Sequence, residues 1–232
     1  MSTLRVDVWS DIACPWCYVG KRRLEAAIAR VGERAEVEVV WHAFELDPAA
    51  PPVRDTSESY AVRLAKKYGT TAEEAEGMLA NMTSVAAVDG LEFHFERVRA
   101  GNTFDAHRLI HFAGERGLQD TMKERLLRAY LTEGEAIGDR EVLVRLAVEA
   151  DLDAEEVRGV LASDGHADAV REDEAMARKL GVTGVPFFVI DRKYAVSGAQ
   201  HADVLATVLG RALDEQPVEL ADGAACGPDG CA

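Results

Sequence analysis

The sequence is poor in cysteine and contains no long apolar run. Four cysteines in 232 residues are too few for the disulfide framework of a small secreted domain. No stretch approaches the roughly 20 apolar residues of a membrane-spanning helix, and the opening MSTLRVDVWS lacks the apolar core of a signal peptide. We therefore expect a cytoplasmic protein without a membrane partner, in which closely spaced cysteines do redox chemistry or bind metal.

Positive charge is also scarce. The chain has 26 Lys and Arg residues against 41 Asp and Glu, which gives a formal net charge of -15 at pH 7. This charge would repel a phosphate backbone, and the basic residues are scattered among acids rather than clustered, so we expect no nucleic-acid partner. Hydrophobic residues form 48% of the composition and charged residues 29%, as in a folded globular protein.

The N-terminal part alternates between strand and helix patterns. Apolar and polar side chains alternate over residues 4–8, as in a half-buried strand. A helical apolar stripe follows from Pro15 to Gly32, and residues 36–41 alternate again. A strand, helix and strand of these lengths predict a right-handed unit with two parallel strands.

The middle of the sequence has a helical composition, and the strand and helix pattern returns after it. A short extended piece is expected at residues 91–95, where apolar and polar residues alternate. The predicted helices cover residues 57–67, 72–82, 104–116, 120–131, 139–149, 154–162, 167–180 and 202–213, and a β-hairpin is predicted at 187–190 and 194–197. The expected domains are one discontinuous α/β domain (1–55 and 165–216), a helical insertion (56–164) and a C-terminal tail (217–232).

The cysteine pair at the start of the first helix is the strongest candidate site. Cys14 and Cys17 enclose Pro15 and Trp16, and Pro15 occupies the position where proline best begins a helix. Unpaired backbone N–H groups and the positive end of the helix dipole would favour the thiolate form of Cys14. Cys17 lies one turn deeper, so we expect Cys14 to attack a substrate sulfur and Cys17 to resolve the mixed disulfide. The alternatives are a structural disulfide and half of a metal site.

A second motif lies far away in the sequence. Pro186 directly precedes the apolar run 187–190, where its missing N–H confines it to the beginning of a strand. A cis Val185–Pro186 bond would present the Val185 backbone to a substrate strand. The alternative is a trans proline that only opens the strand.

Taken together, these motifs resemble the thioredoxin superfamily, and more closely the DsbA family with its FrnE-like cytosolic branch. The resemblance rests on SDIACPWCYVGK (10–21), NTFDAHRL (102–109) and GVTGVPFFVI (181–190), and it covers the chain from Leu4 to Leu213. It implies a thioredoxin-like domain, with a central mixed sheet flanked by helices, that carries a large inserted all-α domain. The implied activity is that of a dithiol-disulfide oxidoreductase, and disulfide isomerase activity is a second activity that the resemblance allows.

The resemblance also implies roles for individual residues. Pro186 would be the cis-proline beside the redox pair, and Asn102, His107 and Arg108 would overlook the substrate groove. Asn102 alternatively caps the next helix, and the other two alternatively form a solvated or core-edge face. Strongly oxidising DsbA-like enzymes have a histidine where this chain has Trp16, so a less oxidising enzyme is expected. The alternative is that Trp16 only covers Cys17 at the surface and does not tune its reactivity.

The last two cysteines form a second candidate pair. Cys226 and Cys231 enclose GPDG, which suits a type I turn that brings its two ends within about 7 Å. They would serve as an auxiliary redox pair that exchanges with Cys14 and Cys17. The alternative is a loose tail with two incidental thiols.

Two other function classes compete with disulfide exchange. Kappa-class glutathione transferases and 2-hydroxychromene-2-carboxylate isomerases also insert helices into a thioredoxin domain, but they use glutathione with a serine or a single thiol. A zinc module would use all four cysteines. For the leading hypothesis we expect no metal and no cofactor besides the redox-active disulfide, with glutathione as a candidate co-substrate. The expected partners are protein thiols and disulfides or a small thiol, and the expected state is a monomer or homodimer.

Overall fold

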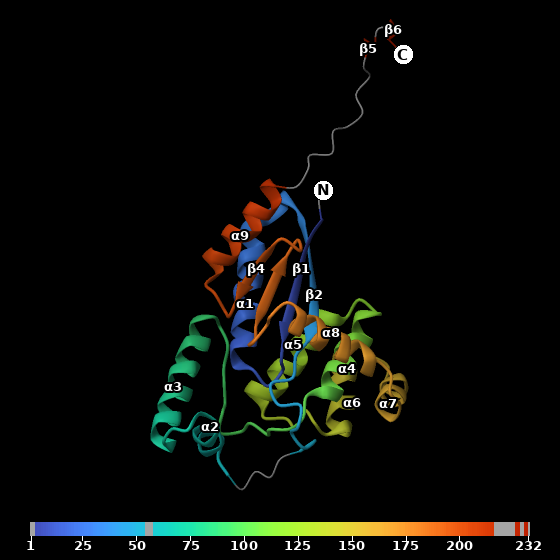
Figure 1. Cartoon of the computed structure of the whole chain (residues 1–232). Helices are drawn as coiled ribbons and strands as arrows, with labels where there is room; N and C mark the ends of the chain where they lie inside the picture. The colour runs from blue at the N-terminus through green and yellow to red at the C-terminus, as the bar shows by residue number, and fades with distance from the viewer. Residues whose placement is uncertain (1–2, 54–57, 216–225, 228–229, 232) are drawn as a thin grey trace.

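The structure is a computed structural model that describes residues 3–53, 58–215, 226–227 and 230–231 (Figure 1). Its centre is a mixed four-stranded sheet in the order β2-β1-β3-β4. β1 (Thr3–Ser10) pairs in parallel with β2 (Glu36–Ala43) and antiparallel with β3 (Phe187–Ile190). β4 (Tyr194–Ser197) completes the predicted hairpin. The parallel pair and the hairpin confirm the predicted sheet.

Helices cover both faces of this sheet. α1 (Pro15–Val31) and α9 (Ala202–Asp214) pack together on one face, against the buried Leu4, Val6 and Val8 of β1. α8 (Ala167–Lys179) covers the other face, where Trp9 packs with Ala177. The apolar side chains of β1 therefore lie on both faces of the sheet: Leu4, Val6 and Val8 on one face, and Trp9 on the other. The thioredoxin-like fold expected from the resemblance is confirmed.

The inserted helices form two groups at the end of the sheet where β1 leads into α1 (Figure 1). The first group is an arm of α2 (Tyr60–Tyr68) and α3 (Ala72–Val88), which contact each other. The second group contains α4 (Phe104–Gly114), α5 (Gln119–Arg128), η2 (Ala129–Glu133), α6 (Arg140–Glu149) and α7 (Ala154–Ala162). α8 contacts both β2 and α4, so it joins the insertion to the sheet.

The extended piece expected at residues 91–95 is not a strand. Leu91, Phe93 and Phe95 are buried as the alternation predicted, but the segment lacks a neighbouring strand among the described residues. Its aromatic side chains instead stack on other rings, Phe93 on Tyr18 and Phe95 on Tyr60. The period of two therefore reflects alternate burial without a β-ladder.

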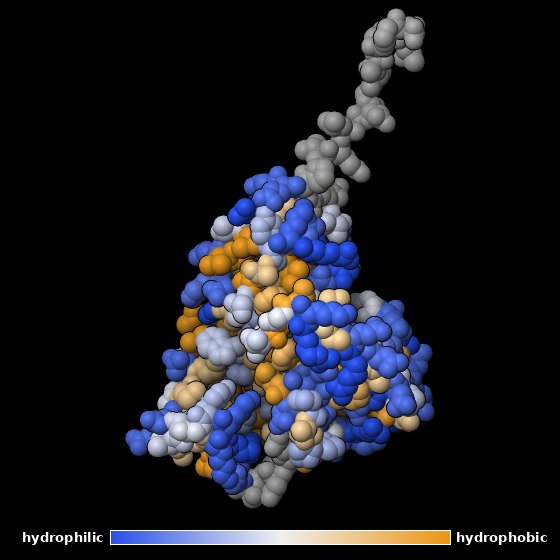
Figure 2. Space-filling view, in the orientation of Figure 1, coloured by the Kyte–Doolittle hydropathy of each residue, from blue (hydrophilic) through white to orange (hydrophobic). Residues whose placement is uncertain are grey.

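Polar side chains cover most of the face seen in Figure 2, and hydrophobic residues gather around α9 and β4. None of the helices in the described ranges is both long and apolar enough to cross a bilayer.

Candidate active site

Cys14 lies at the junction of β1 and α1, as the sequence predicted. It is the N-cap residue of α1 with an extended backbone (φ -101°, ψ 111°), and Pro15 follows at the first helical position. The backbone N–H of Cys17 donates to Cys14 O at 3.0 Å. The Cys14 thiol donates to Val185 O, at an Sγ to O distance of 3.5 Å. The helix start and the Val185 loop therefore hold this sulfur from two sides.

The two thiols differ in their access to solvent. Cys14 is 5% exposed and lines a cavity, whereas Cys17 is 1% exposed and does not line it. Burial, followed by a hydrogen bond with Cys14, raises the pKa of the Cys17 thiol well above its ordinary range. Cys14 is thus accessible from the cavity, while Cys17 is buried beside it.

The Val185–Pro186 loop lies directly beside the pair. Its peptide bond is cis, and Pro186 O accepts a hydrogen bond from Gly198 N at 2.8 Å, which ties the loop to the end of β4. On the other side Pro186 approaches α1 at Gly20, where an added Cβ would lie 2.8 Å from Pro186 Cγ. Glycine at this position allows the helix and the loop to pack in contact.

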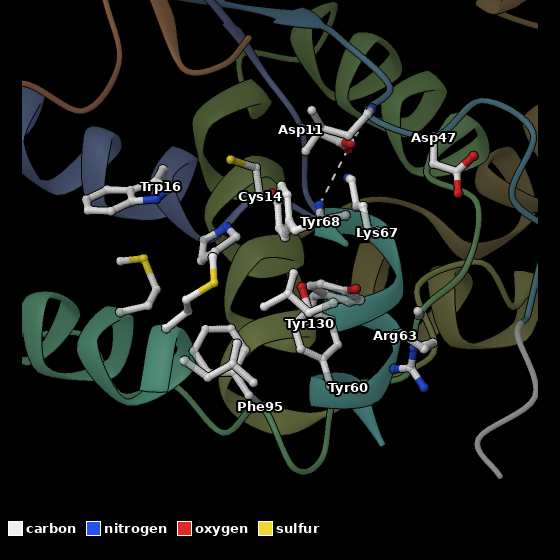
Figure 3. A pocket seen from close by; sticks show the side chains of 18 of the residues that line it. Asp11, Cys14, Trp16, Asp47, Tyr60, Arg63, Lys67, Tyr68, Phe95 and Tyr130 are labelled. Atoms are coloured by element: carbon white, nitrogen blue, oxygen red, sulfur yellow. Dashed lines mark hydrogen bonds between the residues drawn. The ribbon is translucent and has the colours of Figure 1, made fainter. Parts of the chain in front are cut away.

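A cavity of about 560 Å³ extends from Cys14 to the arm of α2 and α3. In Figure 3, Trp16 lies on one side of Cys14 and Tyr68 on the other, with aromatic rings of the arm and of residues 95 and 130 below. Trp16, Leu46, Tyr68 and Met78 line this cavity and are also partly exposed to solvent. Other lining residues are Tyr60, Arg63, Leu64, Lys67, Leu79, Met82, Phe95 and Tyr130.

Two buried charged groups lie near the cysteines, Asp11 as a lining residue of the cavity and Lys123 in the core, and sequence reasoning missed both. Asp11 accepts hydrogen bonds from Leu46 N (2.8 Å), Ala13 N (3.4 Å) and His107 Nε2 (3.3 Å). Although burial acts to raise it, these bonds leave the pKa of Asp11 lowered. Lys123 of α5 is fully buried, and its charge interacts with both cysteines and with Asp11.

The three residues expected to overlook the groove occupy different positions. Asn102 accepts from Phe104 N (2.8 Å) and donates to Glu45 Oε1 (3.2 Å), which fits the capping alternative. His107 is buried against Asp11. Arg108 is buried, and its guanidinium donates to Gly165 O (2.8 Å) and to two backbone carbonyls at the end of α7 and just after it. None of the three lines the cavity, so their contact with substrate stays a prediction.

The proposed auxiliary redox pair and the alternative zinc module both involve the two C-terminal cysteines, Cys226 and Cys231. β5 (Cys226–Gly227) and β6 (Gly230–Cys231) pair antiparallel, with Cys226 opposite Cys231. The side chains of these two cysteines and residues 216–225 lie outside the described part of the chain. Within the described part, no cluster of three or more His, Cys, Asp or Glu residues has the arrangement of a metal site.

Comparisons with known proteins agree with the fold. A family model described as a DSBA-like thioredoxin domain matches residues 5–210. A crystal structure of a probable DsbA oxidoreductase from Streptomyces coelicolor is 48% identical, with a TM-score of 0.86 over 99% of this chain and 98% of that chain. The uncharacterized protein YwbO of Bacillus subtilis (strain 168) is 30% identical over 92% of this chain and 98% of its own length.

A more distant structure with a similar fold belongs to an enzyme of a different class. A 2-hydroxychromene-2-carboxylate isomerase is 16% identical, with a TM-score of 0.64 over 89% of this chain and 95% of that chain. At this identity the similarity concerns the fold only.

Proposed function

Because the chain belongs to the family of DsbA-like thioredoxin domains, we propose that it is a thiol–disulfide oxidoreductase whose redox centre is Cys14 and Cys17. The observation that carries the proposal is a pair of thiols one helix turn apart, of which one faces a cavity and the other is buried. We further place it in the FrnE-like branch and in the cytoplasm, where a less oxidising pair that reduces or isomerises disulfides is expected.

The proposed reaction proceeds in two exchanges. The Cys14 thiolate attacks a substrate disulfide, which forms a mixed disulfide and releases one substrate thiolate. Cys17 then attacks Cys14 Sγ, which forms the Cys14–Cys17 disulfide and releases the second substrate thiolate. The substrate gains two electrons and the enzyme loses two, and the reverse sequence oxidises a substrate dithiol. Cys226 and Cys231 would exchange with the oxidised pair.

Trapping of the intermediate tests this reaction. Cys17→Ser should accumulate a covalent adduct between Cys14 and an unfolded protein whose cysteines are mixed disulfides with a small thiol. The small thiol leaves as Cys14 attacks, and no thiol remains to resolve the adduct. Cys14→Ser should accumulate none, although Cys17 is still present. Non-reducing gels and peptide mass mapping would read out the adduct. Equal trapping by both variants, or full turnover without Cys17, would contradict the proposed division of roles and favour the glutathione-dependent alternative.

We also propose the class of substrate. The cavity that Cys14 faces is lined mainly by aromatic and aliphatic side chains, and its rim exposes Trp16, Tyr68 and Met78. A folded substrate hides its apolar side chains, so such a cavity suits an unfolded or partly folded protein whose apolar residue lies next to the reacting cysteine. Burial of that residue would hold the substrate sulfur near Cys14.

Matched peptides measure this preference. A peptide disulfide with Phe beside its cysteine should react with kcat/KM about tenfold higher than the same peptide with Asp, because burial of one large apolar side chain contributes about 1.5–3 kcal/mol. Met78→Glu, on the cavity rim, should reduce the ratio. Met176→Glu is the matched control, since Met176 is equally exposed (46% against 45%) but lies on α8 outside the cavity. Equal rates for both peptides would overturn the assignment.

A further inference from the structure

Two buried lysines lie near the ring of Trp41, and their surroundings differ. Lys21 Nζ pairs with Glu25, with Asp120 (3.1 Å) and with Glu124 (3.1 Å), and lies 6.0 Å from the ring centroid. Although burial opposes it, these carboxylates raise the pKa of Lys21. Lys21 is therefore a fully compensated charge, as expected for a structural ion pair.

Lys123 has no such compensation. Its Nζ is 5.6 Å from the centroid of the Trp41 ring and donates one long hydrogen bond to Ser10 O, at 3.4 Å. Among the described residues, no carboxylate forms an ion pair with it. An ammonium group has three donors, so two of them lack a protein acceptor in this part of the chain. Burial lowers the pKa of Lys123 to about 8.

A second polar atom in the same place is unsatisfied. Ser10 Oγ is buried and has no hydrogen-bond partner among the described residues, although the carbonyl of the same residue accepts from Lys123. Buried polar atoms without partners are rare in folded proteins, and each calls for an explanation, such as a catalytic role. Lys123 Nζ and Ser10 Oγ are thus two buried polar atoms with few hydrogen bonds to the described residues.

The charged groups that interact with Lys123 connect it to the cysteine pair. They are Cys17, Asp11, Cys14 and Lys21, with Cys17 contributing the largest charge interaction. Asp11 already accepts from His107 and from two backbone N–H groups, which makes it a weak base. Lys123 interacts electrostatically with Cys17, and its pKa of about 8 allows it to take up a proton near neutral pH.

We propose that Lys123 accepts the proton of Cys17 when Cys17 resolves the mixed disulfide, and returns it in the reverse reaction. This inference rests on the proposed function. The Cys17 S–H bond breaks and an N–H bond forms on the neutral Lys123 amine. Cys17 Sγ then bonds to Cys14 Sγ, the bond from Cys14 to the substrate sulfur breaks, and its electron pair leaves with the substrate thiolate. The mixed disulfide is the oxidant, so no other reactant is required.

The location explains why a lysine suits this step. Because Cys17 is buried, forming its thiolate without a nearby positive charge would be costly. Transfer of the proton to Lys123 creates the thiolate and the ammonium together, and their attraction is strong in a medium of low dielectric constant. The step moves no net charge into the core.

The reaction with 5,5′-dithiobis(2-nitrobenzoate) separates this step from the first exchange. All proteins compared carry Cys226→Ser and Cys231→Ser, so that only Cys14 and Cys17 react. Stopped-flow absorbance should show a first release of thionitrobenzoate that depends on reagent concentration, as Cys14 attacks. A second release, independent of reagent concentration, should follow as Cys17 resolves the adduct.

Lys123→Met should slow the second release about 100-fold at pH 7, because it removes a general base, and should leave the first within about threefold. The variant should be at least as stable as its parent, since an apolar side chain of similar length replaces a poorly compensated charge. Lys21→Met is the matched control: it should lower the melting temperature, because three carboxylates each lose one ion-pair partner, but should leave the second release within about threefold.

The pH dependence gives a measurement that needs no substitution at Lys123. In the parent protein the rate of the second release should rise with pH and level off above about pH 8, where Lys123 is neutral. A second release that is unchanged in folded Lys123→Met, or that shows no inflection near pH 8 in the parent, would overturn the inference. Absence of any second release in the parent would instead refute the proposed function, because Cys17 would then not resolve the adduct.

Discussion

Replacement of Cys14 by serine is expected to abolish catalysed disulfide exchange while leaving the fold intact. A serine hydroxyl remains protonated at neutral pH and cannot form a disulfide, so the rate should fall by roughly 10³-fold or more. Serine is close to cysteine in volume, and its hydroxyl can still donate to Val185 O, as the thiol does over 3.5 Å. The change in the free energy of unfolding should therefore stay within about 1 kcal/mol.

Reduction of insulin disulfides, followed by turbidity, measures the rate, and thermal unfolding measures stability. The result also distinguishes the rival enzyme class. Kappa-class glutathione transferases and the related isomerases work with a serine or a single thiol, so an enzyme of this class that can use serine would tolerate this change. If Cys14→Ser retained turnover in the presence of glutathione, the dithiol mechanism would be refuted in favour of that class.

The sequence predicted the elements of the fold well because their signals are local. α1 begins at Pro15, as expected from proline at the first helical position, and the hairpin strands have the predicted bounds. The position of Cys14 at this helix start followed from the same signal. Hydrophobic periodicity and the residues that begin or end helices are sufficient to predict an element whose structure neighbouring residues determine.

The surroundings of the cysteines could not be predicted in the same way. Lys123 falls within a predicted amphipathic helix, where a lysine usually faces solvent, and only the packing of α5 on β2 buries it beside Trp41. Asp11 lies three residues before Cys14, but its partner His107 is 96 residues away in sequence. Such contacts depend on how distant elements pack, and a single sequence carries no direct record of them.

A second buried network, on the opposite face of the sheet, makes a prediction about stability. His42 on β2 lies between two carboxylates, with Nδ1 2.5 Å from Asp173 Oδ1 and Nε2 2.8 Å from Asp7 Oδ1. Asp173 on α8 also accepts from Ala43 N (2.7 Å) and pairs with His111 (2.8 Å). Trp9 stacks on the His42 ring, with centroids 4.5 Å apart. This network fastens α8 to the sheet.

The charges of this network set a pH window. Although burial acts to lower it, hydrogen bonds to Asp173 and Asp7 raise the pKa of His42 to about 9. His42 therefore contributes stability that is fully present below about pH 6.5 and is lost as the pH rises through 9, about 3 kcal/mol in all. Despite burial, bonds from His42 and Arg5 lower the pKa of Asp7 to about 2. Its contribution is present above about pH 4 and is lost as the pH falls through 2.

Asp173→Asn should lower the free energy of unfolding at pH 6 by about 3–5 kcal/mol, because it breaks a buried ion pair and leaves His42 with a single carboxylate. The alkaline loss of stability between pH 6.5 and 9 should also become smaller, since the pKa of His42 would be raised less. Urea unfolding across pH 4 to 10 would measure both effects.

Asp203→Asn provides the matched control for this substitution. Asp203 pairs with Arg30 across α9 and α1, but both side chains are largely exposed, so its loss should change stability by less than about 1 kcal/mol and should not alter the pH profile. The same chemical change at a buried and at an exposed pair thus isolates the effect of burial. An equally small effect at Asp173 would mean that desolvation of the network offsets its attraction, and that α8 is held to the sheet by the apolar contacts of Trp9 and Ala177 instead.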